Sequence, residues 1–204
     1  ASNLGSMKTG VIGTGNIGKS LIKILHGFGA SVFAFDINQD HIFAEKYDLK
    51  YCTLTKLYST SEIIFICVPL NKATEYMVNQ KSIDKMKKGV FLINTSRGKN
   101  INTKVLLKEI DAGKIGGAAL DVYENEQNWF FNNHSKTGID DQLLNSLIDH
   151  PKVILTGHQA FFTKNAIENI SKIMYKNVFD FIHNQHSENF IVNRIVPDIH
   201  QLLD

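Results

Sequence analysis

A glycine-rich turn between two apolar segments places the strongest constraint on the fold of this chain. Gly13, Gly15 and Gly18 stand in a Gly-x-Gly-x-x-Gly pattern within the run VIGTGNIG. An apolar-rich run of strand length, residues 9–12, precedes the pattern, and apolar residues recur at helical spacing over residues 17–28 after it. Glycines at this spacing permit a tight turn and a close approach of the backbone. The pattern therefore predicts a strand, a tight turn and a helix in that order.

The same alternation continues along the chain. Further runs of strand length occur at residues 31–35, 63–68, 90–93, 117–120 and 153–155, and helical stretches separate most of them, including residues 103–112 before Gly113. Strands that are apolar on both faces and alternate with helices are typical of a parallel sheet wound by right-handed crossovers. We therefore expect an α/β fold, a doubly wound parallel sheet of the Rossmann type.

A dinucleotide site is expected at the glycine turn. The free amides at the start of the helix, those of Asn16 and Ile17, would attract phosphates. Asp36 ends the second strand, where its carboxylate could accept hydrogen bonds from both ribose hydroxyls and would repel a 2′-phosphate. NAD is the cofactor expected from this pattern. A glycine-rich turn with an unrelated acid downstream is the alternative, and the strand–helix–strand context disfavours it.

Composition narrows the class of partner. The chain has 204 residues, of which 43% are hydrophobic, and 22 Lys and Arg balance 20 Asp and Glu. One principal core is expected, with a small molecule as partner rather than nucleic acid or a membrane. The two cysteines, Cys52 and Cys67, lack the spacing of a metal site, so no metal is expected, and a reducing cytoplasm is the expected location.

The two ends and one internal segment depart from the alternation. Residues 1–6, ASNLGS, resemble the remainder of a cloning tag, so we expect an NAD-binding domain over residues 7–186. The tail, residues 187–204, has no clear period. Residues 124–150 are too long for an ordinary connection, and we interpret them as a cover near the site. Thr163 is expected to cap a long helix with an apolar face made of Ile167, Ile170, Met174, Val178 and Phe181.

Three segments with chemically active side chains follow predicted strands. They are NTSRG at residues 94–98, GAALDVYENE at residues 117–126 and TGHQAFFT at residues 156–163. The carboxyl ends of parallel strands line one crevice, so we expect Arg97, Asp121, Glu126 and His158 to converge. A single Arg or His in such a position is more often structural, but the segments together indicate a catalytic site.

At these residues the chain resembles the D-isomer-specific 2-hydroxyacid dehydrogenases, from Met7 to about Phe190. The run DVYENE followed by WFF, the long segment and GHQAFFT resemble the D-lactate dehydrogenase branch, which implies pyruvate and D-lactate as the substrate pair. The resemblance implies that Arg97 holds the substrate carboxylate, that His158 is the acid/base and that Glu126 orients it. A carboxylate beside an imidazole favours the protonated ring.

The resemblance also implies contacts along the cofactor. Asp121 matches a residue near the nicotinamide, and four further positions match backbone or side-chain contacts. Cys67 stands where family members often carry His, and we expect it to be a packing residue. The four positions that match contacts along the cofactor are Val68, Pro69, Thr95 and Ser96.

Family members have a second lobe that closes over the substrate, and we expect that lobe to be absent from this chain. Three hypotheses stay open: an enzyme fragment that retains NAD binding, a non-catalytic NAD-binding module, and a dehydrogenase completed by a separately encoded lobe. Another 2-hydroxy acid could also be the substrate. A homodimer through the cofactor domain is possible by fold analogy. The tail after Phe190 is interpreted as a return to the second lobe.

Overall fold

The computed structural model describes residues 3–183. The chain divides into two compact units, Ala1–Ala160 and Phe161–Asp204. The larger unit contains the whole sheet, and the described part of the smaller unit contains one long helix.

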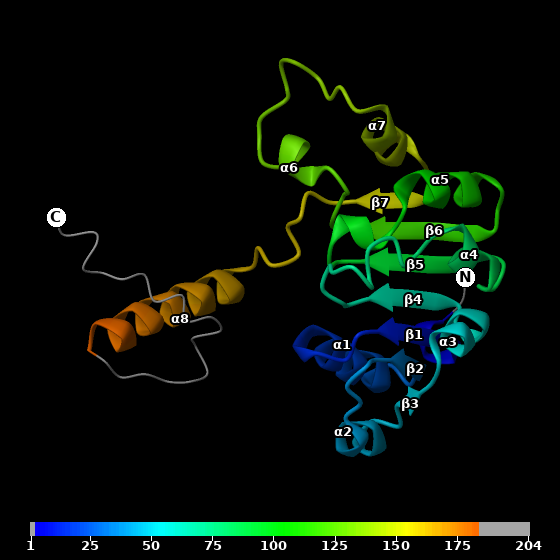
Figure 1. Ribbon diagram of the computed structural model, residues 1–204, viewed down its shortest axis with the longest axis horizontal. Coiled ribbons are helices and arrows are strands. Elements are labelled where there is room, and N and C mark those ends of the chain that lie inside the picture. The colour runs from blue at the N-terminus through cyan, green and yellow to red at the C-terminus, as the bar shows by residue number, and fades with distance from the viewer. Residues whose placement is uncertain (1–2, 184–204) are drawn as a thin grey trace. The chain divides into compact units, whose positions relative to one another are not determined.

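Seven parallel strands form one sheet in the order β3-β2-β1-β4-β5-β6-β7 (Figure 1). The strand order reverses between β1 and β4, and open parallel sheets bind ligands at the carboxyl ends beside such a reversal. The expected doubly wound α/β fold is confirmed, and each of the six predicted strands is present. The strands are β1 (Lys8–Ile12), β2 (Ser31–Phe35), β3 (Lys50–Tyr51), β4 (Ile63–Ile66), β5 (Val90–Asn94), β6 (Ile115–Leu120) and β7 (Val153–Leu155).

Seven α-helices accompany the sheet in the larger unit. Their bounds are α1 (Asn16–Gly27), α2 (His41–Lys46), α3 (Leu54–Thr60), α4 (Gln80–Asp84), α5 (Thr103–Asp111), α6 (Glu126–Trp129) and α7 (Gln142–Asp149). The predicted helices before Gly29 and Gly113 correspond to α1 and α5, and both glycines have the positive φ that favours glycine. In the smaller unit, α8 (Lys164–Ile182) begins at Thr163, whose side chain accepts from the Ala166 amide as predicted.

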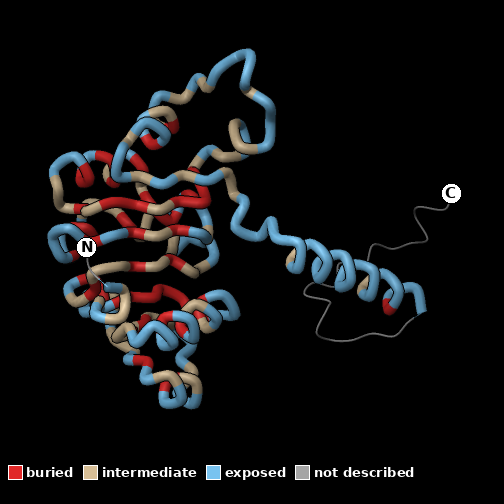
Figure 2. Tube along the Cα trace, turned by 180° about the vertical axis from the view of Figure 1, so that it is seen from behind, coloured by how far each residue is buried: buried red, intermediate tan, exposed pale blue. Residues whose placement is uncertain are grey.

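The core lies on both faces of the sheet, because successive strand residues point to opposite sides. Val11 belongs to a cluster with residues of α1 and α2, whereas its neighbour Ile12 belongs to a larger cluster with residues of α3, α4, α5 and α7. Figure 2 shows the buried positions concentrated along the strands. Burial is incomplete on one side, where Phe91 is 45% exposed and Ile154 is 69% exposed. Strands β5 and β7 therefore leave apolar side chains exposed on one face of the sheet.

The long segment over residues 124–150 is partly helical. Helix α7 begins after Asp141, whose carboxylate accepts from the amides of Leu143 and Leu144, and Leu144 and Leu147 are buried. An Asp followed by leucines at this spacing is a helix-start signal that the sequence interpretation missed. In the part of the chain that the structure describes, no helix combines the length and apolar character needed to cross a membrane.

Candidate active site

The three glycines of the turn have different roles. Gly13 has φ +97°, and its amide donates to the carbonyl of Phe35 over 2.8 Å. A Cβ atom on Gly18 would lie 2.0 Å from the carbonyl oxygen of Gly13, so the turn itself requires glycine there. A Cβ atom on Gly15 would meet nothing within 4 Å. Gly13 and Gly18 therefore serve the fold, whereas Gly15 keeps the outer face of the turn open.

Helix α1 starts at this open face. Gly15 is its N-cap residue and provides no side-chain cap. The helix has 12 residues, and the amides of its first turn, which include those of Asn16 and Ile17, have no carbonyl partner within the helix. Such amides, together with the helix dipole, attract a phosphate group.

The carboxylate of Asp36 lies against the turn. Its Oδ2 atom accepts from the amide of Thr14 over 2.5 Å and from the Thr14 hydroxyl over 3.1 Å, while Oδ1 accepts from the amide of Asn38 over 2.8 Å. Burial by itself raises the pKa of Asp36, but these hydrogen bonds outweigh it and lower the pKa below its ordinary value. Asp36 is therefore an anion beside the turn at neutral pH.

His158 and Glu126 form a direct pair. The Nδ1 atom of His158 lies 2.9 Å from Oε1 of Glu126, and both side chains are partly buried. The second Glu126 oxygen, Oε2, accepts from the amide of Tyr123, which fixes the carboxylate in place. The ring of Phe131, from the long segment, lies 6.3 Å from the imidazole. The other ring nitrogen of His158, Nε2, takes no part in this pair.

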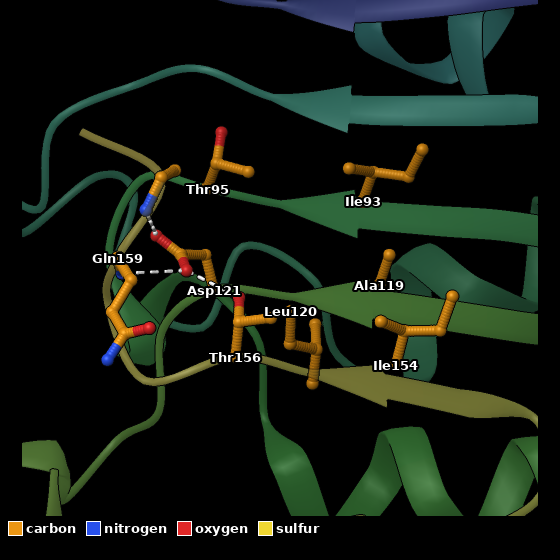
Figure 3. A pocket seen from close by; sticks show the side chains of 9 residues that line it. Ile93, Thr95, Ala119, Leu120, Asp121, Ile154, Thr156 and Gln159 are labelled. Carbon is orange, nitrogen blue, oxygen red and sulfur yellow. Dashed lines mark hydrogen bonds between the residues drawn. The ribbon is translucent and has the colours of Figure 1, made fainter. Parts of the chain in front are cut away.

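Asp121 holds the loop that carries His158. Figure 3 shows its carboxylate between Thr156 and Gln159. Oδ1 accepts from the Thr156 hydroxyl and the Gln159 amide, over 2.5 and 2.9 Å, and Oδ2 accepts from the Ala160 amide over 2.9 Å. Burial raises the pKa of Asp121, whereas these bonds and the nearby His158 lower it, with a net lowering. The proximity of Asp121 to a nicotinamide stays a prediction.

Arg97 lies at the end of β5 in a closely packed loop. Its amide donates to Asn100 Oδ1, its carbonyl accepts from Asn94 Nδ2, and its guanidinium donates to the carbonyl of Ser96. A Cβ atom on Gly98 would lie 2.1 Å from the carbonyl carbon of Tyr123, so glycine is needed next to Arg97. Arg97 and Glu126 line one cavity of about 340 Å³. The structure therefore places Arg97 and Glu126 on one cavity and bonds His158 to Glu126, whereas Asp121 lines another cavity. A shared catalytic role for these residues stays a prediction.

The remaining predicted positions connect the ends of β4 and β5. The Ser96 hydroxyl donates to the carbonyl of Val68, and the carbonyl of Pro69 accepts from the Thr74 hydroxyl. Thr95 and Asp121 line a second cavity, of about 250 Å³. Cys67 packs against the smaller core cluster, which confirms it as a packing residue, and burial raises its pKa to about 11.

Glu124 is a structural residue of the site that the sequence interpretation missed. Its carboxylate accepts from the hydroxyl of Tyr76 and from the amide of Thr103, both over 2.7 Å. The bond to Glu124, followed by burial, raises the pKa of Tyr76 to about 12. Glu124 therefore ties the strand-end segment that carries Glu126 to the start of α5. Its position inside DVYENE was the only sequence signal, because its partners are distant in the chain.

Comparison with known proteins identifies the family. The family model described as "D-isomer specific 2-hydroxyacid dehydrogenase, NAD binding domain" matches residues 1–160. This chain belongs to that family. A D-lactate/D-glycerate dehydrogenase of Pediococcus acidilactici is 39% identical over 91% of this chain and 56% of its own length.

Solved structures agree with this placement in the D-lactate dehydrogenase branch. A D-lactate dehydrogenase from Treponema pallidum has a TM-score of 0.86 at 35% identity, covering 90% of this chain and 55% of its own. The enzyme from Lactobacillus jensenii, solved with NAD+, has a TM-score of 0.88 at 30% identity, covering 95% and 58%. The chain thus spans somewhat more than half the length of the relatives that it matches.

NAD is the cofactor of this family, and the residues of this chain fit it. The open face at Gly15 and the first-turn amides of α1 suit a pyrophosphate, and the anionic Asp36 suits a ribose that carries free hydroxyls. The glycine turn and Asp36 lie together at the ends of β1 and β2, whereas Arg97, Glu126 and His158 lie at or beyond the ends of β5, β6 and β7.

Proposed function

We propose that this chain carries the NAD-binding part of the active site of a D-2-hydroxyacid dehydrogenase that interconverts pyruvate and D-lactate. One observation carries the proposal. His158 and Glu126 are hydrogen-bonded over 2.9 Å, and Glu126 shares a cavity of about 340 Å³ with Arg97. A cation, a carboxylate and an imidazole at one edge of the sheet suit the reduction of a keto acid.

Each of the three residues has a task in this reaction. When NADH is bound, it supplies the hydride for the keto carbon. The guanidinium of Arg97 is suited to hold the substrate carboxylate through two parallel hydrogen bonds. The proton on Nε2 of His158 passes to the keto oxygen, and in the reverse direction Nε2 takes it back from the hydroxyl. Glu126, bonded to Nδ1, keeps the ring in the tautomer and orientation that this transfer needs.

The glycine turn, α1 and Asp36 form the proposed cofactor site, in which the carboxylate of Asp36 binds the adenosine ribose. All of these groups lie within residues 1–160. This chain matches only 55–56% of the length of these relatives, and we propose that residues from the rest of that length cover the substrate. A site open to water on one side holds a keto acid poorly, and a misplacement of about 1 Å can cost about 100-fold in rate.

The test combines a titration and an assay on the full chain. NADH fluorescence is expected to show binding at micromolar to millimolar concentrations, tighter than NADPH by roughly 10-fold or more. Steady-state assays with pyruvate and longer 2-keto acids are expected to show little turnover. A chimera that adds the missing part of the Pediococcus acidilactici relative is expected to restore it. Absence of NADH binding would refute the proposal.

Two other results would change the proposed function. A turnover number of ordinary size, about 10 per second, would show that this chain alone builds a complete site. A folded chimera that binds NADH but reduces no 2-keto acid would favour a non-catalytic NAD-binding module instead.

A further inference from the structure

Asp36 is held by a chain of hydrogen bonds that extends well beyond the glycine turn. The hydroxyl of Thr14, which donates to Asp36 Oδ2, also lies 2.9 Å from the hydroxyl of Tyr51 in β3. The Tyr51 oxygen in turn accepts from the amide of Asp40 over 3.2 Å. Thr14 is only 4% exposed, so water does not readily replace these partners. We call the four residues Asp40, Tyr51, Thr14 and Asp36 the relay.

The direction of every hydrogen in the relay follows from the chemistry of its groups. An ionised carboxylate only accepts, so the single hydroxyl proton of Thr14 points to Asp36. The bond between the two hydroxyls then uses the proton of Tyr51, with Thr14 as acceptor. The Tyr51 oxygen is left to accept from the Asp40 amide. Each group therefore donates toward Asp36, and aligned bonds of this kind strengthen one another.

The far end of the relay is anchored on two helices. The carboxylate of Asp40 caps α2 by accepting from the amide of Phe43, over 3.0 Å, and it also pairs with the ammonium of Lys19 in α1, over 2.5 Å. The relay consequently connects α1, α2, β3 and the glycine turn to the end of β2.

The relay also decides which oxygen of Asp36 is available. A carboxylate has about four acceptor positions, two on each oxygen. Both positions on Oδ2 are used by Thr14, through its amide and its hydroxyl, and one position on Oδ1 is used by Asn38. The acceptor positions left for a ligand lie on Oδ1, and the carboxylate cannot rotate without breaking its bonds to Thr14 and Asn38.

We propose that Thr14 and Tyr51 are positioning residues that hold Asp36 in the orientation that selects a free ribose over a 2′-phosphorylated one. This inference rests on the proposed role of Asp36 in ribose binding. A carboxylate fixed in advance loses little freedom when the ribose binds. The same fixed anion cannot turn away from a 2′-phosphate, so rigidity increases the discrimination between the two cofactors.

The test measures the dissociation constants of NADH and NADPH for the full chain and its variants. Thr14→Val removes the hydroxyl donor to Asp36 but keeps the amide donor, and it is expected to weaken NADH binding about 5- to 10-fold. Tyr51→Phe acts one hydrogen bond further from Asp36 and is expected to weaken NADH binding about 2- to 5-fold. NADPH affinity should change less than about 2-fold in both variants. The dissociation constant of NADPH divided by that of NADH should therefore fall.

Two controls match these changes. Thr14→Ser keeps the hydroxyl and is expected to retain the parent ratio. Tyr47→Phe makes the same change at the end of α2, where the Tyr47 ring packs against His26 and Phe43, and it should leave both constants unchanged. Thermal melting of every variant shows which are folded, and Thr14→Val decides the matter if Tyr51→Phe does not fold.

The outcomes distinguish a failure of the relay from a failure of the proposed role of Asp36 in ribose binding. Equal weakening of NADH and NADPH by Thr14→Val would indicate a merely structural role and would overturn the relay. Asp36→Asn is expected to abolish the preference for NADH. An unchanged ratio in Asp36→Asn would refute the proposed role of Asp36 and the relay with it. If the preference for NADH is lost in Asp36→Asn but kept in Thr14→Val and Tyr51→Phe, the relay alone is overturned.

Discussion

Nδ1 of His158 lies 2.9 Å from Oε1 of Glu126, although the two residues are 32 positions apart. Strand geometry alone does not produce this contact. The backbone of His158 has φ +53°, a conformation that residues other than glycine rarely adopt, and its amide donates to the carbonyl of Asp121 over 2.7 Å. The loop that begins at Thr156 is thus bent and held so that the imidazole faces Glu126.

The first prediction concerns this pair. In the two-part chimera described above, His158→Ala is expected to lower pyruvate reduction by about 10²- to 10⁴-fold, because the proton donor is removed. Glu126→Gln retains an acceptor but loses the charge, and a smaller loss of about 10- to 100-fold is expected. NADH affinity should stay within about 2-fold in both variants. Equal losses of turnover and NADH binding would show that the pair supports the fold rather than the chemistry.

The second prediction concerns Asp121 and stability. Asp121→Asn is expected to lower the free energy of unfolding at pH 7 by about 1–3 kcal/mol, because three donors lose a charged acceptor. The pKa of Asp121 is lowered in the folded chain, so the stabilisation is present above the unfolded pKa of about 3.9 and is lost as pH falls through the folded value. The difference between parent and variant should therefore shrink below about pH 4.

Urea unfolding followed by circular dichroism at pH 7, 5 and 3.5 measures this difference. Asp149→Asn, at the exposed end of α7, is the matched control and should change stability by less than about 0.5 kcal/mol. A difference between Asp121→Asn and the parent that stays constant across this pH range would mean that the charge of Asp121 is not responsible.

The third prediction separates the glycines of the turn. Gly18→Ala would place a Cβ atom 2.0 Å from the Gly13 carbonyl oxygen, and a loss of stability of at least about 1–3 kcal/mol is expected. Gly15→Ala meets no such obstacle and should cost less than about 1 kcal/mol. Its added methyl group would face the pyrophosphate, so NADH affinity should fall at least about 10-fold.

Gly27→Ala, which also has open space around the added Cβ atom, serves as control at the other end of α1 and should affect neither property adversely. Unfolding curves and NADH titrations on the same samples give both quantities. Unchanged NADH binding in Gly15→Ala would place the pyrophosphate elsewhere.

The fourth prediction concerns the two thiols. Burial raises the pKa of Cys67 to about 11, so at pH 8 only about one molecule in a thousand carries the reactive thiolate. Burial also raises the pKa of Cys52, but less strongly. Iodoacetamide should therefore label Cys52 well before Cys67 in the folded chain, as measured by peptide mass spectrometry. Labelling in urea should remove the difference, and Cys52→Ser isolates the slow reaction. Equal rates in the folded chain would contradict the burial of Cys67.

Local sequence patterns determined much of this protein. The glycine spacing, the apolar runs, Gly113 at a helix end and the helix cap at Thr163 act over a few residues, so they predicted β1, α1, α5 and α8. Polar residues directly after strands indicated Arg97, Glu126 and His158, because parallel strands end at one edge. Helix α7 and the two-residue strand β3 were missed, the latter because two residues show no period.

Tertiary structure alone decided the hydrogen bonds between distant segments. The contacts of Asp121 with Thr156, of Glu124 with Tyr76, and of Thr14 with Tyr51 span 35, 48 and 37 positions. Each depends on which strands are neighbours and on where a side chain points, and periodicity along the chain specifies neither. Residue types at the strand ends could thus be assigned a chemistry from the sequence, whereas the groups that hold them in place became visible only once the chain was folded.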